Sequence, residues 1–120
     1  PVYVSFCIKD NCTAKLKAAD ISESGVSVYL HTEEAKKLIE ILSEITTDAE
    51  KIHTPFELEI ELPREGSISA VGELRNVISM DDGVHVRLGF SISIKENDRR
   101  KLRQYIMRRQ REILEQLKAL

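Results

Sequence analysis

The sequence has few of the residues that usually carry metal or catalytic chemistry. Tryptophan is absent, and only two cysteines and three widely spaced histidines are present. Two cysteines cannot complete a four-ligand zinc site, so no metal and no cofactor are predicted. The order and spacing of the residues show no Ser/His/Asp arrangement, no phosphate loop and no paired carboxylate beside a histidine. The sequence therefore predicts no catalytic residues and no enzyme activity.

Long apolar runs and a strong net charge are also lacking. No apolar run approaches the roughly 20 residues that span a bilayer, and no basic segment followed by an apolar one marks a signal peptide. The formal net charge is only −2. We expect a cytoplasmic protein without a membrane span. In that compartment disulfides are rare, so Cys7 and Cys12, on either side of an expected hairpin turn, are predicted to be reduced.

The length of 120 residues fits one domain with a modest core. Charge is unevenly distributed along it. Residues 95–120 carry nine Lys/Arg against four Asp/Glu, a net charge of +5, which leaves −7 for the remainder. The basic run between Arg99 and Arg111 raises the possibility of nucleic-acid binding. We rank this hypothesis last, because Tyr105 is the only aromatic residue that accompanies the run and charge runs are usually solvated helix faces.

Alternation of apolar and polar residues predicts a mainly β protein. Asp10-Asn11, residues 63–66 and residues 80–83 are turn signals between alternating segments. Gly72 marks a possible bulge or bend. Six strands with one buried face each suggest a small antiparallel sandwich or barrel. The predicted strands are residues 2–9, 12–21, 26–31, 56–62, 68–79 and 84–94.

Two segments have helical periodicity instead. Thr32 is a suitable N-cap for an amphipathic helix over residues 33–45, and a polar linker over residues 46–54 follows it. We interpret this inserted helix as a lid over one open end of a barrel, with a partner surface as the alternative. Asn97 is a suitable N-cap for a second helix over residues 97–119.

The stretch Asp20-Ile21-Ser22-Glu23-Ser24-Gly25 begins at the end of the strand predicted over residues 12–21 and leads into the strand predicted over residues 26–31. Asp20 and Ser22 are two residues apart, so in an extended chain their side chains leave the same face. Gly25 can adopt a positive φ in the tight turn that follows. This pattern predicts a carboxylate and a hydroxyl at the rim of a sheet. They either bind the edge of a planar polar ligand or satisfy backbone groups of the corner.

This DxSxxG stretch resembles the signature of the PilZ domain, a bacterial receptor domain for cyclic di-GMP. The resemblance continues in order and covers roughly residues 12–107. Phe56–Leu62 resembles the central apolar strand of the family, and residues 71–77 resemble the strand that follows it. Leu88-Gly89-Phe90 resembles a shortened form of the last-strand motif. Residues 97–107 resemble the closing helix.

The resemblance implies a six-stranded antiparallel β-barrel and a non-catalytic regulatory module. Such a module binds cyclic di-GMP and signals through protein contacts. The ligand-binding residues it implies are Asp20, Ser22 and Gly25. The alternative is a divergent PilZ domain that binds no nucleotide and acts as an oligomeric protein-interaction adaptor.

The family's RxxxR motif supplies arginines just before the first strand; no such motif is found at that place here, and no arginine precedes Arg64. Three explanations are open: the natural chain continues before Pro1, the chain begins there, or the arginines come from elsewhere. Arg99 and Arg103 have the required spacing. Arg75 and Arg87, on two predicted strands, are the other candidates.

The end of the second helix has apolar residues beyond the length that a barrel can cover. We therefore expect residues 1–107 to form the barrel domain and residues 108–120 to form a helical extension. A second copy of the same helix is the simplest partner for such residues, which predicts a homo-oligomer. Ile106, Ile113 and Leu120 form a short, partly polar heptad seam with Arg103, Gln110 and Leu117.

Overall fold

A computed structural model describes residues 1–8, 10–45 and 55–120. The predicted linker over residues 46–54 lies outside this part of the chain. The elements follow the order β1 (Tyr3–Ile8), β2 (Asn11–Cys12), β3 (Leu16–Ile21), β4 (Gly25–His31), α1 (Thr32–Ile45), β5 (Phe56–Leu62), β6 (Gly66–Ser79), β7 (His85–Ile94) and α3 (Glu96–Lys118).

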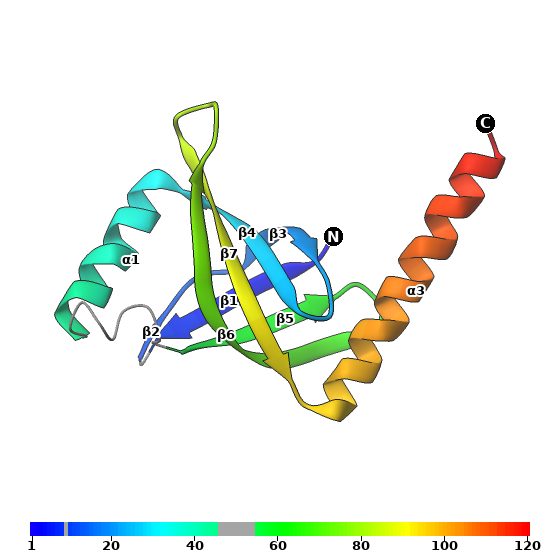
Figure 1. Cartoon of the computed structure of the whole chain (residues 1–120), viewed down its shortest axis with the longest axis horizontal. Helices are drawn as coiled ribbons and strands as arrows, with labels where there is room; N and C mark the ends of the chain where they lie inside the picture. Colours follow the sequence, from blue (N-terminus) through cyan, green and yellow to red (C-terminus); the bar gives the residue numbers. More distant parts are fainter. Residues whose placement is uncertain (9, 46–54) are drawn as a thin grey trace.

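The strands form an antiparallel sheet in the order β2-β1-β3-β4-β7-β6-β5, and pairing of β1 with β5 closes it. The two-residue β2 is an addition to the hairpin before β3, so the barrel itself has six strands (Figure 1). The predicted six-stranded antiparallel barrel with two helices is confirmed. The segment predicted as one strand over residues 12–21 is divided, because β2 ends at Cys12 and β3 begins at Leu16.

The barrel interior is filled by the apolar half of each alternating strand, as the sequence predicts. Phe6, Phe56 and Phe90 meet at its centre, with ring centroids 5.2–5.7 Å apart. Helix α1 packs on β4 and β7 and buries Ala35 and Leu42, which agrees with its interpretation as a lid. The other large side chains that are almost fully buried include Val4, Ile8, Val28, Ile60, Ile68, Leu88 and Leu102.

Both helices begin earlier than predicted. Helix α1 includes Thr32, whose hydroxyl donates to Val84 O at 2.7 Å, while His31 Nδ1 accepts from Glu33 N at 3.3 Å. The histidine ring therefore takes the role expected of Thr32. Helix α3 begins at Glu96 after Lys95, so Asn97 is not its N-cap.

Two glycine predictions are wrong. Gly25 is not among the glycines with positive φ, which are Gly66 and Gly83. A Cβ at Gly25 would lie 3.1 Å from Phe90 O, so close approach of the backbone explains glycine there. The irregularity of β6 lies between Leu74 and Asn76 rather than at Gly72.

The prediction of two reduced cysteines is also wrong. Cys7 and Cys12 are directly opposite in the β1–β2 register, with Cα atoms 4.0 Å apart, and they form a disulfide. The prediction of free thiols came from the rarity of disulfides in the cytoplasm. The hairpin register instead places the two cysteines side by side, where they can bond.

Candidate ligand-binding site

The corner between β3 and β4 positions the DxSxxG residues. The β3–β4 register shifts between Ala18 and Asp20, which re-aims the end of β3. Ser22 N donates to Gly25 O at 2.8 Å and closes the turn. The hydroxyl of Ser22 lies 3.4 Å from both Gly25 O and Ser24 N. Ser22 therefore helps to hold the corner, as the alternative interpretation from sequence required.

The carboxylate of Asp20 belongs to a closed set of three side chains. Ser27 Oγ donates to Asp20 Oδ1 at 2.8 Å, and Arg87 Nη2 donates to Asp20 Oδ2 at 2.6 Å. Arg87 Nε in turn donates to Ser27 Oγ at 3.1 Å. Ser27 is buried, whereas 64% of the Asp20 side chain remains accessible. The carboxylate is thus oriented by side chains and is still open to solvent on one side.

A shallow pocket of about 300 Å³ lies against this corner. Asp20, Ser22 and Gly25 all line it, so the structure brings the three predicted site residues together. Arg75 and Arg87, which sequence could not place, line the same pocket from β6 and β7. Its remaining lining residues are Ser24, Val26, Ser27, Asn76, Gly89, Phe90 and Ser91.

Arg75 is held at the edge of this corner pocket. Its Nε donates to Ser91 Oγ at 2.9 Å, and its Nη2 lies 3.0 Å from a carboxylate oxygen of Glu73. The side chain is 56% exposed. A guanidinium has five N–H donors, so Arg75 and Arg87 both keep donors beyond those used here. The pocket therefore combines a carboxylate, a turn hydroxyl and two guanidinium groups.

Asn76 covers the backbone at the floor of the pocket. A Cβ at Gly89 would lie 2.4 Å from Asn76 Oδ1, so a larger residue there would displace the Asn76 side chain. Sequence reasoning missed Ser27, Asn76 and Gly89 as parts of the site. Only the pairing of β4 with β7 and of β7 with β6 identifies these residues, because it places Ser27 opposite Gly89 and Gly89 opposite Asn76. That register is not readable from local sequence.

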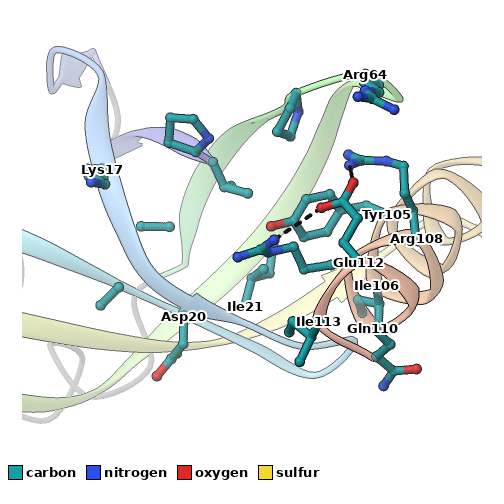
Figure 2. Close-up of a pocket in the computed structure, with 16 residues that line it drawn as sticks. Lys17, Asp20, Ile21, Arg64, Tyr105, Ile106, Arg108, Gln110, Glu112 and Ile113 are labelled. Carbon is teal, nitrogen blue, oxygen red and sulfur yellow. Dashed lines mark hydrogen bonds and ion pairs between the residues drawn. The ribbon is translucent and has the colours of Figure 1, made fainter. Parts of the chain in front are cut away.

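A larger groove of about 620 Å³ lies on the other side of β3, between the barrel and α3. Figure 2 shows Tyr105, Ile106 and Ile113 along its helical wall, while the Asp20 carboxylate points away from that wall. Lys17 and Arg64 bring positive charge to its rim. Asp20 lines both hollows, so the groove and the corner pocket meet at this residue.

One ion-pair network fixes α3 beside the groove. Arg108 Nε and Nη2 donate to the two carboxylate oxygens of Glu65 at 2.8 and 3.0 Å, and Arg108 Nη1 donates to Glu112 at 2.7 Å. Hydrogen bonding to Arg108 holds the pKa of Glu65 below its ordinary value and lowers that of Glu112. The same bonds raise the pKa of Arg108. Because only 8% of the Glu65 side chain is accessible, this pair is shielded from solvent.

The arginines with RxxxR spacing lie elsewhere. Arg99 Nη2 donates to Ile94 O at 3.3 Å, and Arg103 Nε donates to Glu23 Oε1 at 2.7 Å. Neither arginine lines the corner pocket. The pair between Arg103 and Glu23 nevertheless connects α3 directly to the DxSxxG turn.

Other kinds of site find no support in the described residues. No cluster of three or more His, Cys, Asp or Glu side chains is placed to hold a metal ion there. Within the same ranges, no helix combines the length and apolar character needed to cross a membrane. The glutamates of β5 face outward, where Glu61 pairs with Lys15 at 2.9 Å.

The fold is similar to that of solved PilZ-domain proteins, which match it over nearly the whole chain. One is the Bacillus subtilis inhibitor of motility MotI/DgrA, with a TM-score of 0.67, 18% identity and coverage of 92% of this chain and 47% of that chain. Another is K. pneumonia MrkH in complex with c-di-GMP, with a TM-score of 0.66, 18% identity and coverage of 99% and 49%. At such identities the similarity establishes the fold.

Comparison of sequences adds one relative. No family model matches the chain. An uncharacterized protein of Aquifex aeolicus (strain VF5) is 35% identical over 122 residues, which is 100% of this chain and 50% of that protein. The chain therefore spans about half the length of this relative and of the similar solved structures.

Proposed function

We propose that this domain is a non-catalytic receptor module that binds cyclic di-GMP at the corner pocket formed by the DxSxxG turn, Arg75 and Arg87. The observation that supports it is the convergence of Asp20, Arg75 and Arg87, from three different strands, on one open pocket. The similarity to MrkH, which was solved with c-di-GMP, agrees with this assignment.

The ligand presents two guanine bases and two phosphates. A carboxylate such as that of Asp20 accepts from the N1–H and N2–H donors of a guanine edge. Guanidinium groups bridge phosphate oxygens or bind O6 and N7 of a purine. Arg87 already orients Asp20 and has donors left for an anion. In this proposal Arg75 and Arg87 provide the guanidinium chemistry that RxxxR provides in the family.

Calorimetry with cyclic di-GMP tests this function. We expect saturable heat with the wild-type chain and no measurable heat with Asp20→Ala. Removal of Arg75 or Arg87 costs one bidentate contact each, about 1–3 kcal/mol, and weakens binding roughly 5- to 150-fold. Asp10→Ala is the matched control, because Asp10 is an exposed turn residue away from the pocket. Absence of heat with the wild-type chain would refute the proposal.

The alternative is an adaptor that binds no nucleotide and acts through self-association of the helical extension over residues 108–120. It is favoured by the exposure of Ile113, Leu114 and Leu117, each between 44% and 59% accessible. Saturable nucleotide binding by residues 1–120 counts against it.

Nucleic-acid binding stays last among the hypotheses. Arg103, Arg108 and Arg109 already pair with carboxylates at 2.7–3.1 Å. The cytoplasmic location stays a prediction, and a disulfide such as Cys7–Cys12 is rare in that compartment. Cell fractionation with an antibody to the chain would decide it.

A further inference from the structure

Strand β6 has two neighbours over only part of its length. Strand β5 pairs with it from Gly66 to Gly72, whereas β7 continues to pair with it as far as Ser79. Among the described residues, no strand pairs with the other side of residues 73–79. Figure 1 shows the tip of the β6–β7 hairpin projecting beyond the strands beside it. The barrel is therefore closed, but one extended segment of it has an open edge.

Within the described ranges, backbone donors and acceptors of this edge have no strand partner. Met80 N donates to His85 O at 2.9 Å, which makes these residues a hydrogen-bonded pair next to the turn. In an antiparallel ladder such pairs alternate with pairs that make no bonds to each other. The N–H and C=O groups of Ser79 and Val77 therefore point away from β7, toward the open side.

Glu73, Arg75 and the irregularity between Leu74 and Asn76 protect the start of this edge, whereas residues 76–79 carry no such protection. Natural sheets protect exposed edges with lysine, proline or inward charges. Residues 76–79 are Asn, Val, Ile and Ser. Val77 is 52% exposed and Ile78 is 50% exposed, and as neighbours in a strand they face opposite sides of the sheet. An unprotected apolar edge of this kind is suited to adding a strand.

We propose that the open edge of β6 pairs with the same edge of a second copy, antiparallel and centred on Ile78. In this register Val77 of each copy is opposite Ser79 of the other, and their outward groups exchange four hydrogen bonds. The two Ile78 residues then form a non-hydrogen-bonded pair, the arrangement that brings opposite side chains closest. An interface that places each residue opposite its symmetry mate is the isologous type found in twofold dimers.

Charge complementarity supports this register and this occupant. Arg75 lies three residues before Ile78, and Asp81 lies three residues after it. Antiparallel pairing centred on Ile78 therefore points Arg75, at the irregularity of β6, toward Asp81 in the turn of the other copy. Asp81 is exposed and has no ion-pair partner within the described chain. Arg75 also lines the corner pocket, so the second copy would approach that pocket. The inference itself does not rest on nucleotide binding.

The contact is small. A few residues from each edge bury less than the roughly 1,000 Å² expected of a stable interface. The dimer should therefore be reversible and should form at high protein concentration. A covalent trap is the appropriate test for such a contact.

Ile78→Cys provides this trap. Cα atoms of a non-hydrogen-bonded antiparallel pair are about 4.5 Å apart, within the range that a disulfide bridges. Cys7 and Cys12 are bonded to each other, so the new thiol is the one free thiol in the described residues. Val71→Cys is the matched control. Val71 is 52% exposed on the same strand, but there β6 is paired on both sides.

We expect Ile78→Cys to give a cross-linked dimer on a non-reducing gel under mild oxidation, and Val71→Cys to remain monomeric. The same result is expected when Leu117→Glu is added, which excludes helix–helix contact as the source. Equal cross-linking of both cysteine variants would overturn the proposal, as would cross-linking of neither.

A charge exchange tests the register. Sedimentation at high concentration should show less dimer for Arg75→Asp and for Asp81→Arg than for the wild-type chain. The double variant should recover the wild-type distribution. If the double variant is no better than the single ones, Arg75 and Asp81 do not meet and the register centred on Ile78 is wrong.

Discussion

The two parts of α3 have the same kind of sequence and opposite environments. In the first part Leu102 is fully buried against the barrel, and Tyr105 and Ile106 pack on the same core. In the last part the apolar residues continue at helical spacing but are exposed: Ile113 44%, Leu114 55%, Leu117 59% and Leu120 99%. The comparison teaches that periodicity predicts a helix face, whereas the extent of the barrel decides how much of that face is buried.

The largest effect should come from deleting a side chain in the first part. Leu102→Ala leaves a cavity beneath α3 and should lower the free energy of unfolding by about 2–5 kcal/mol. Leu117→Ala removes the same atoms from an exposed site and should change it by less than about 0.5 kcal/mol. Urea denaturation of both variants makes the comparison. Similar losses would mean that the end of α3 is buried in solution.

A second contrast concerns acid sensitivity. The pKa of Glu65 is held below its ordinary value of 4.5 by Arg108. A carboxyl with a depressed pKa in the folded state stabilises the fold above its unfolded-state pKa, and this contribution is lost as pH falls through the folded-state value. The wild-type chain should therefore lose stability below pH 4.5 more steeply than Glu65→Gln.

Thermal melts of both proteins between neutral and acidic pH would measure this. Glu115→Gln, on the exposed end of α3, is the matched control and should keep the wild-type slope. If Glu65→Gln follows the wild-type curve throughout, the pair with Arg108 does not govern acid sensitivity.

A charge introduced in the last part of α3 should have the smallest effect on folding stability. Its effect on the oligomeric state should be clear. If this part self-associates, Leu117→Glu should shift the sedimentation distribution toward the monomer without changing the melting temperature. Gln116→Glu introduces the same charge on a neighbouring helix position and should leave the distribution unchanged. An unchanged oligomeric state with Leu117→Glu would exclude the helical extension as the contact.

Most of the fold could be predicted from the alternation of apolar and polar residues along the strands. Residues such as Phe6, Phe56 and Phe90 are buried because apolar side chains recur with a period of two, and this pattern is visible in the sequence. The caps of both helices were predicted less well. Thr32 was expected to cap its own helix but bonds to Val84 O, because strand pairing brings that carbonyl within reach.

The candidate site was predicted only in part. The DxSxxG pattern pointed to Asp20, Ser22 and Gly25, which do line one pocket. The partners of Asp20 could not be derived from sequence. Arg87 lies 67 positions from Asp20 and meets it only because β3 pairs with β4 and β4 pairs with β7.

The sequence alone determined that alternating strands and two amphipathic helices form, since these patterns depend on residues close together in the chain. The tertiary structure decided which charges meet, which cysteines bond and which edge stays open. These features depend on strand register and on the length over which neighbouring strands overlap. Both are properties of the closed sheet as a whole, because each strand is placed by the two that flank it.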